Sequence, residues 1–224
     1  AQGMSRDRGV VPAPQCVPVG NVVTAAEPAC AEPLAVCLHA ASRAGDLRGK
    51  KVLVTGAGPI GALVVAAARH AGAGEIVVTD LMLAALDRAW AMGATGVVNV
   101  TRDGAKLAEY EADKGYFDIA FECSAAGPAI RSAIATLRPR GQIVQVGVTG
   151  DVPVPLNALV GKELTWTGSQ RFDAEFTQAV KLIGSREIDV RPIISHSFPI
   201  DEAVTAFEQA GDRAVACKVQ LTFL

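Results

Sequence analysis

Residues 51–61 read KVLVTGAGPIG, and residues 75–80 read EIVVTD. An apolar run followed by glycines at G-x-G-x-x-G spacing is typical of a strand that turns into a helix beneath a dinucleotide pyrophosphate. The first glycine permits the tight turn, the second lets the backbone approach the pyrophosphate, and the third lets the helix pack on the strand. We therefore expect this loop to bind the cofactor through Gly56, Gly58, Pro59, Ile60 and Gly61.

Asp80 ends the next apolar run, 19 residues after Gly61. A carboxylate at this place accepts hydrogen bonds from a ribose 2′-OH and repels a 2′-phosphate, which predicts NAD rather than NADP as cofactor. The alternative is a glycine-rich turn in an unrelated α/β domain. The register of strand, glycines, helix, strand and acid favours dinucleotide binding.

The length and charge of the chain exclude several classes of partner. It has 224 residues, half of them hydrophobic, and a formal net charge of −2. This charge gives no electrostatic reason to expect nucleic acid or an anionic membrane as a partner. No apolar run approaches the ~20 residues of a membrane span, and residues 1–9 (AQGMSRDRG) contain no apolar signal-peptide core.

The five cysteines follow no repeated spacing, which favours free thiols in a reducing, cytoplasmic location over a disulfide framework. Cys30, Cys37 and His39 lie close in sequence, but their spacing is not that of a zinc finger. We expect them to be packed residues of an alanine-rich helix.

Strand and helix patterns alternate through the middle of the chain. The apolar strand candidates are residues 51–55, 75–79, 97–100, 117–121, 141–146 and 163–168. Helical stretches separate most of them, at residues 59–72, 82–93, 104–112 and 127–138. This alternation predicts a parallel sheet with right-handed crossovers, and the continuous apolar strands predict helices on both of its faces.

The remaining segments are less regular. Residues 9–19 suggest a bent edge strand or an irregular connection, and residues 24–44 suggest a short helix, a break near Pro33 and a longer helix. Residues 148–162 are expected to be a connection. The tail is expected to form a helix at 173–184, an extended piece at 193–199, a helix at 201–210 and a strand at 215–222.

Catalytic residues are scarce in this sequence. It contains no Tyr-x-x-x-Lys and no HExxH motif, and its three histidines have no obvious acidic partner. One candidate is Glu32, which stands among alanine, proline and leucine in AEPLAVCLHA. Its carboxylate either binds a metal or metal-held water, or is a helix-start acid in solvent; composition alone favours the second reading.

Five stretches of the sequence change the preference between the two readings of Glu32. They are AEPLAVCLHAASRAGDLRGKKVLVTGAGPIGALVVAAAR (31–69), DKGYFDIAFECSA (113–125), LRPRGQIVQVGV (137–148), KELTWTGSQRF (162–172) and EIDVRPIISHSFPIDEAVTAFE (187–208). Over residues 9–224 the chain resembles the zinc-dependent medium-chain alcohol and polyol dehydrogenases, and within them the sorbitol and L-idonate 5-dehydrogenases.

The resemblance implies roles for particular residues. Glu32 matches the glutamate at the catalytic zinc, and Arg171 matches an arginine near the substrate and the nicotinamide. Val146, Gly147 and Val148 match the backbone segment that holds the nicotinamide amide. Gln170 stands where the family usually has phenylalanine, which puts packing on the nicotinamide in doubt.

The resemblance also implies a domain organisation. We expect an α/β fold with a doubly wound, parallel, six-stranded Rossmann sheet and a remnant of a second, catalytic domain. Residues 1–34 would be that remnant with a linker, residues 35–172 the NAD-binding domain, and residues 173–224 the return segment of the catalytic domain. The family's zinc-binding cysteine and G-H-E motif have no match, so the chain alone is expected to bind NAD and to be inactive.

Three hypotheses for function follow. The first is a dehydrogenase that moves a hydride between NAD and a polyol or an L-idonate-like sugar acid, with zinc polarising the alcohol oxygen in the full-length parent. The second is a stand-alone NAD-binding module, and the third is a zinc-free quinone reductase, against which Glu32 and Asp80 argue. The family also predicts a homodimer or homotetramer that pairs through the edge strand at 163–168.

Overall fold

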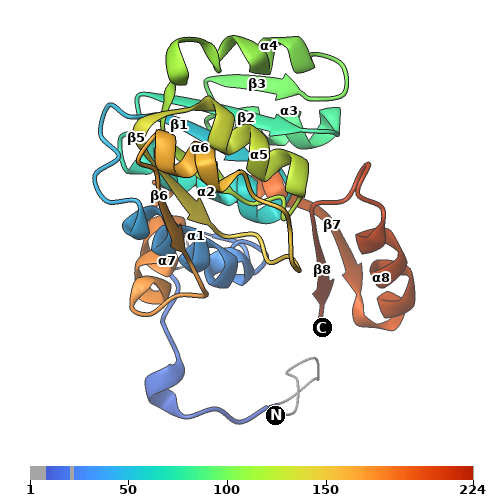
Figure 1. The fold of residues 1–224 in the computed structure, drawn as a ribbon. Helices are drawn as coiled ribbons and strands as arrows, with labels where there is room; N and C mark the ends of the chain where they lie inside the picture. Colours follow the sequence, from blue (N-terminus) through green and yellow to red (C-terminus); the bar gives the residue numbers. More distant parts are fainter. Residues whose placement is uncertain (1–8, 21–22, 224) are drawn as a thin grey trace.

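The computed structural model describes residues 9–20 and 23–223 (Figure 1). Most of residues 1–9, which contain no apolar signal-peptide core in the sequence, lies outside the described residues. A six-stranded sheet in the order β3-β2-β1-β4-β5-β6 forms the centre, and every neighbouring pair in it is parallel. Its strands are β1 (Lys51–Thr55), β2 (Glu75–Asp80), β3 (Gly96–Asn99), β4 (Phe117–Glu122), β5 (Leu137–Gln145) and β6 (Thr165–Gly168).

Helices cover both faces of this sheet, as the apolar strands predicted. One apolar cluster joins the sheet to α1 (Ala31–Arg43), α2 (Pro59–His70), α3 (Leu83–Ala91) and α7 (Glu175–Gly184). The other cluster joins the opposite face to α4 (Gly104–Glu109), α5 (Gly127–Thr136) and α6 (Leu156–Gly161). Successive residues Leu53 and Val54 belong to different clusters because side chains alternate across a strand. The strand order reverses between β1 and β4, so the predicted doubly wound Rossmann sheet is confirmed.

The C-terminal part forms a second, smaller sheet (Figure 1). Strands β7 (Ile194–Pro199) and β8 (Lys218–Thr222) pair in parallel, and α8 (Ala203–Gly211) connects them. In Figure 1 this unit lies to the right of the main sheet. Short 3₁₀ turns complete the described chain at Ala13–Gln15, Pro28–Cys30, Ala112–Lys114, Arg191–Ile193 and Ile200–Glu202.

Three expectations about local structure differ from the structure in whole or in part. No break occurs near Pro33: α1 begins at Ala31 and includes Pro33 in its first turn, where a missing N–H costs no helical hydrogen bond. The region 148–162 contains α6, a six-residue helix that is too short to show periodicity. Of the two alternatives for residues 9–19, the irregular connection is confirmed and the edge strand is wrong: only Ala13–Gln15 form a regular element, a 3₁₀ turn.

A fourth difference lies at β5, which was expected at 141–146 and begins at Leu137. The preceding helix ends at Thr136, two residues before Arg138, whose helical conformation is disfavoured by Pro139. The register against β4 shifts: Phe117 pairs with Leu137, but Ile119 already pairs with Gln142. The additional residues in β5 therefore form an irregularity, in which Arg140 has a φ of 63°.

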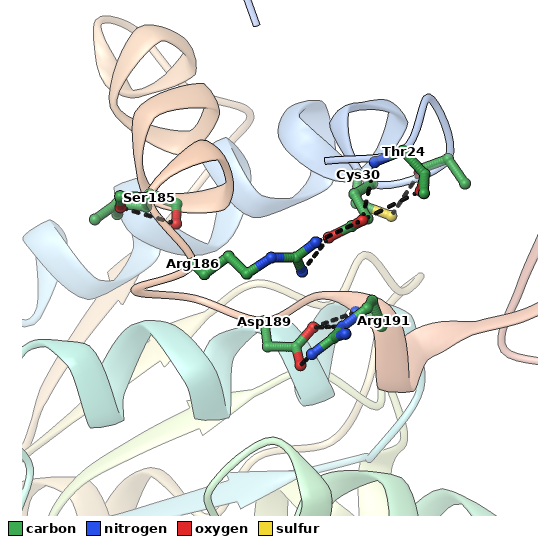
Figure 2. Close-up of polar contacts among 9 residues, drawn as sticks. Thr24, Cys30, Ser185, Arg186, Asp189 and Arg191 are labelled. Atoms are coloured by element: carbon green, nitrogen blue, oxygen red, sulfur yellow. Dashed lines mark hydrogen bonds and ion pairs between the residues drawn. The ribbon is translucent and has the colours of Figure 1, made fainter. Parts of the chain in front are cut away.

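An ion pair joins the N-terminal turn to the segment after α7 (Figure 2). Glu27 is only 3% exposed, and Arg186 donates to it over 2.7 Å from Nη1 and 3.3 Å from Nη2. Thr24 donates to the same carboxylate through its backbone N–H and its hydroxyl. Burial by itself raises the pKa of Glu27, but these hydrogen bonds and the guanidinium hold it below its usual value.

Another ion pair corrects the expectation that no histidine has an acidic partner. His39 Nδ1 on α1 lies 2.9 Å from Glu175 Oε1, at the first residue of α7. Burial by itself raises the pKa of Glu175, and the bonds from His39 and from the Asp173 N–H hold it below its usual value. The pair thus fixes α7 against α1.

Among the described residues, no helix combines the length and the apolar character that a membrane span requires.

Candidate functional site

The glycine loop lies between β1 and α2, at the carboxyl end of the sheet. Gly56 has a φ of +89°, and a Cβ on it would lie 2.9 Å from the Ser124 Cα. A Cβ on Gly61 would lie 1.8 Å from the Gly56 carbonyl oxygen, whereas a Cβ on Gly58 would meet nothing within 4 Å. Gly56 and Gly61 are therefore required by the protein's own packing, and Gly58 leaves open space in front of the backbone.

The N-terminus of α2 faces this open space. Gly58 is the N-cap, Pro59 is the first helical residue, and no side chain caps the helix. The N–H groups of a helix's first turn and its dipole favour an anion such as a pyrophosphate. The loop residues predicted from the sequence thus fit a dinucleotide phosphate.

Asp80 ends β2 and lies beside the glycine loop. Its Oδ2 accepts a 2.7 Å hydrogen bond from the Ala57 N–H, and its Oδ1 accepts one of 2.8 Å from the Met82 N–H. Each carboxylate oxygen has further lone pairs, so a ribose hydroxyl can still donate to it. The carboxylate therefore holds the glycine loop and keeps lone pairs free for a further hydrogen-bond donor.

The segment Val146, Gly147 and Val148 follows β5. Strand β4 lies between β5 and β1, the strand that leads into the glycine loop. The N–H groups of Val146 and Gly147 both donate to the Glu122 carbonyl oxygen, over 2.9 and 2.8 Å. Val148 is 88% exposed. A pocket of about 390 Å³ opens at this segment and extends to Gly168, Ser169 and Gln170 at the end of β6.

The two predicted catalytic residues are both exposed. Glu32 lies in the first turn of α1, and Arg171 follows β6 with a φ of 52°. Within the part of the chain that the structure describes, neither side chain makes a hydrogen bond or an ion pair. Helix α1 contacts the start of α2 through the buried Cys37 thiol, which donates to the Ile60 carbonyl over 3.4 Å. Burial raises the pKa of this thiol.

Glu122, the last residue of β4, is not among the site residues predicted from the sequence. Its side chain is fully buried, and it accepts hydrogen bonds from residues at the ends of β1 and β5. One sequence signal could have found it, because an acid ends the otherwise apolar run FDIAFE just as Asp80 ends EIVVTD. Its partners come from distant segments, so the signal alone could not have assigned them.

Comparison with known proteins places this geometry in a family. The sequence profile described as "Zinc-binding dehydrogenase" matches residues 59–185, more than half of the chain. The chain belongs to the zinc-binding dehydrogenase family. The resemblance seen in the sequence is thereby confirmed.

Two relatives of this chain are named as dehydrogenases of a sugar acid or a polyol. L-idonate 5-dehydrogenase (NAD(P)(+)) of Escherichia coli K12 is 40% identical over 210 residues, which cover 93% of this chain and 61% of the relative. Human sorbitol dehydrogenase is 34% identical over 197 residues, 86% of this chain and 55% of the relative. The chain thus spans about six tenths of the length of these relatives.

Two solved structures have the same fold as this chain. The crystal structure of E. coli L-idonate 5-dehydrogenase superposes with a TM-score of 0.93 at 40% identity, over 96% of this chain and 62% of that one. A putative zinc-binding dehydrogenase from Sinorhizobium meliloti 1021, solved bound to NADP, has a TM-score of 0.82 at 25% identity, over 92% of this chain and 61% of that one.

The residues described in this chain do not by themselves fit a zinc site. A catalytic zinc ion is held by about three protein ligands. Across residues 9–20 and 23–223, no group of three or more His, Cys, Asp or Glu side chains could hold a metal ion. Glu32 offers a single exposed carboxylate, so we assign no reaction step to zinc from these residues.

Proposed function

We propose that the chain forms the NAD-binding part of an oxidoreductase that transfers a hydride between NAD and a polyol or an L-idonate-like sugar acid. One observation carries the proposal: the glycine loop, the uncapped start of α2 and Asp80 meet at one end of the sheet. The 40% identity to L-idonate 5-dehydrogenase supports the substrate class. NAD, when bound, accepts the hydride at its nicotinamide ring.

Each part of the loop has its own task in this proposal. The backbone at Gly58 admits the pyrophosphate, and the first turn of α2 stabilises its charge. Asp80 accepts the ribose hydroxyls and disfavours NADP. Val146, Gly147 and Val148 would hold the nicotinamide end in the pocket that extends to Gln170, the residue before Arg171. Arg171 would orient a substrate carboxylate or hydroxyl, and Glu32 would contribute a carboxylate near a metal.

For the chain by itself we propose NAD binding without polyol oxidation, in a cytoplasmic setting and with no role for nucleic acid or membrane. The absence of three candidate zinc ligands within the described residues favours this binding-module reading for the chain alone. We also propose that two copies pair through β6, an edge strand with unpaired backbone groups. Leu156 and Val160 of α6, just before β6, are 68% and 78% exposed and would be covered by such pairing.

Calorimetric titration tests the proposal. The chain should bind NADH more tightly than NADPH, and it should oxidise neither L-idonate nor sorbitol with NAD and added zinc. The matched control is Gly58→Ala, which should abolish most of the binding. Failure of the unaltered chain to bind NADH would overturn the cofactor assignment, and turnover near ~1 s⁻¹ or above would overturn the binding-module reading.

A further inference from the structure

The buried carboxylate of Glu122 connects the three central strands at the cofactor end of the sheet. Glu122 ends β4 and is 0% exposed. Thr55, the last residue of β1, donates from its hydroxyl to Oε1 over 3.2 Å. Gln145, the last residue of β5, donates from Nε2 to Oε2 over 2.5 Å. One side chain therefore links the strands from which the glycine loop and the 146–148 segment begin.

The same carboxylate also shapes the loop that follows β4. Its Oε1 accepts hydrogen bonds from the N–H groups of Ser124, over 2.9 Å, and Ala125, over 3.0 Å, and from the Ser124 hydroxyl. These bonds hold Ala125 at a φ of 58°, which a non-glycine residue rarely adopts. The Ser124 backbone is also the group against which Gly56 packs. Glu122 thus sets the position of a loop that contacts the glycine loop.

The orientation of the Gln145 amide follows from its two acceptors. Nε2 donates to Glu122 Oε2 and, over 2.8 Å, to the Gly147 carbonyl oxygen. Both hydrogens of the amide nitrogen are used by acceptors, so a flipped amide would oppose oxygen to oxygen at both places. The side chain of Glu122 thereby fixes Gln145, and Gln145 fixes the Gly147 carbonyl.

The segment 146–148 is also in direct contact with Glu122. The Val146 and Gly147 N–H groups donate to its carbonyl oxygen. A Cβ on Gly147 would lie 2.8 Å from Glu122 Oε2 and 2.7 Å from the Ala125 nitrogen. The backbone at Gly147 is therefore seated against the buried carboxylate with no room for a side chain. Gln145 and Ser169 both line the pocket. Their side-chain oxygens, Oε1 and Oγ, are buried and have no hydrogen-bond partner in the described part of the chain.

We propose that Glu122 is a positioning residue for the nicotinamide–ribose end of the cofactor. It acts through Gln145, Ser124 and Gly147, which it holds at the carboxyl ends of β4 and β5. Asp80, which the adenosine ribose would contact, accepts from the Ala57 and Met82 N–H groups and bonds to none of Glu122, Gln145 and Ser124 among the described residues. The inference rests on the proposed function, because it assumes that the site binds NAD.

The experiment compares NADH with AMP, which contains the adenosine end with one phosphate and lacks the nicotinamide ribose. In Glu122→Gln an amide N–H would face the Gln145 N–H donors. We expect the NADH dissociation constant to rise about tenfold or more, the AMP constant to stay within about twofold, and the fluorescence enhancement of bound NADH to fall. Gln145→Met, which keeps the volume but removes the donors, should cause a smaller change of the same kind.

Asp118→Asn is the matched control, because Asp118 lies at the other end of β4 and accepts from the Lys51 N–H and Arg138. It should lower the melting temperature and leave both affinities unchanged. If Glu122→Gln lowers the melting temperature but shifts neither ligand, or shifts both equally, the positioning role is wrong. If that variant does not fold, Gln145→Met decides on the same criterion. Failure of the unaltered chain to bind NADH would instead refute the proposed function.

Discussion

The guanidinium of Arg186 holds the buried carboxylate of Glu27, 159 positions earlier in the chain, with N–O distances of 2.7 and 3.3 Å. Arg186 lies just after α7 and has a φ of 60°. Figure 2 shows its side chain reaching toward the turn that carries Thr24 and Cys30. The contact joins the segment after α7 to the turn before α1, the helix that carries Glu32.

This pair predicts an acid-dependent stability difference. Glu27→Gln should lower the free energy of unfolding by about 2 kcal/mol at pH 7, because a buried charged hydrogen bond is lost. The pKa of Glu27 is lowered by folding, so its contribution is complete above the unfolded value near 4.5 and is lost as the pH falls through the lower folded value. Urea unfolding should therefore show the difference between variant and parent shrinking below pH 4.5. Asp46→Asn, in an exposed pair with Arg48, should change little at pH 7. An equal loss at every pH would contradict this assignment.

The two glycines of the loop should respond differently to alanine. Gly61→Ala should destabilise the fold by at least about 2 kcal/mol, because its Cβ would overlap the Gly56 carbonyl. Gly58→Ala should keep the stability within about 0.5 kcal/mol, since its Cβ meets nothing. It should nevertheless weaken NADH binding about tenfold or more, a loss of at least about 1.4 kcal/mol. Thermal unfolding and NADH titration of both variants measure this contrast, and normal NADH affinity in Gly58→Ala would show that the pyrophosphate lies elsewhere.

Cofactor choice should depend on Asp80. A double change, Asp80→Ser with Leu81→Arg, removes the negative charge and places a cation at a position that is 64% exposed. We expect the ratio of NADPH to NADH affinity to rise about tenfold or more. Asp87→Ser, on the exposed face of α3, is the control and should leave the ratio unchanged. Calorimetry with both cofactors gives the result, and a parent chain that already prefers NADPH would refute the role of Asp80.

Assembly through β6 should be sensitive to charge on that strand. The Ser169 N–H donates to the Gln145 carbonyl of β5, so the N–H of Trp166 faces the open edge. Thr165→Lys places like charges near each other across a twofold axis and should convert a dimer to a monomer. Thr177→Lys on the exposed part of α7 should not. Light scattering over a dilution series distinguishes these outcomes, and a monomeric parent at micromolar concentration would exclude the pairing.

The parts of the fold that depend on neighbouring residues could be predicted from the sequence. The glycine loop, Asp80 and the alternation of apolar strands with helices are local patterns, and the structure confirms the parallel sheet that they predict. The Glu122–Gln145 and His39–Glu175 contacts could not be predicted, because each joins segments that only the folded sheet brings together. The sequence pattern predicts a break at Pro33, but α1 is continuous, because a proline in the first helical turn is tolerated.

The placement of β1 between β2 and β4 has a consequence for amide hydrogen exchange. Residues Val52, Leu53 and Val54 are fully buried, with a neighbouring strand on each side and helices above and below. Their amides should exchange only when the whole domain unfolds, so the glycine loop begins from the slowest-exchanging part of the molecule. The 146–148 segment ends in the 88% exposed Val148, one strand from the sheet's edge, and should exchange by local opening. In the proposed site, the phosphate cradle would thus be protected to the level of global unfolding, whereas the exposed end of the 146–148 segment at Val148 would open locally.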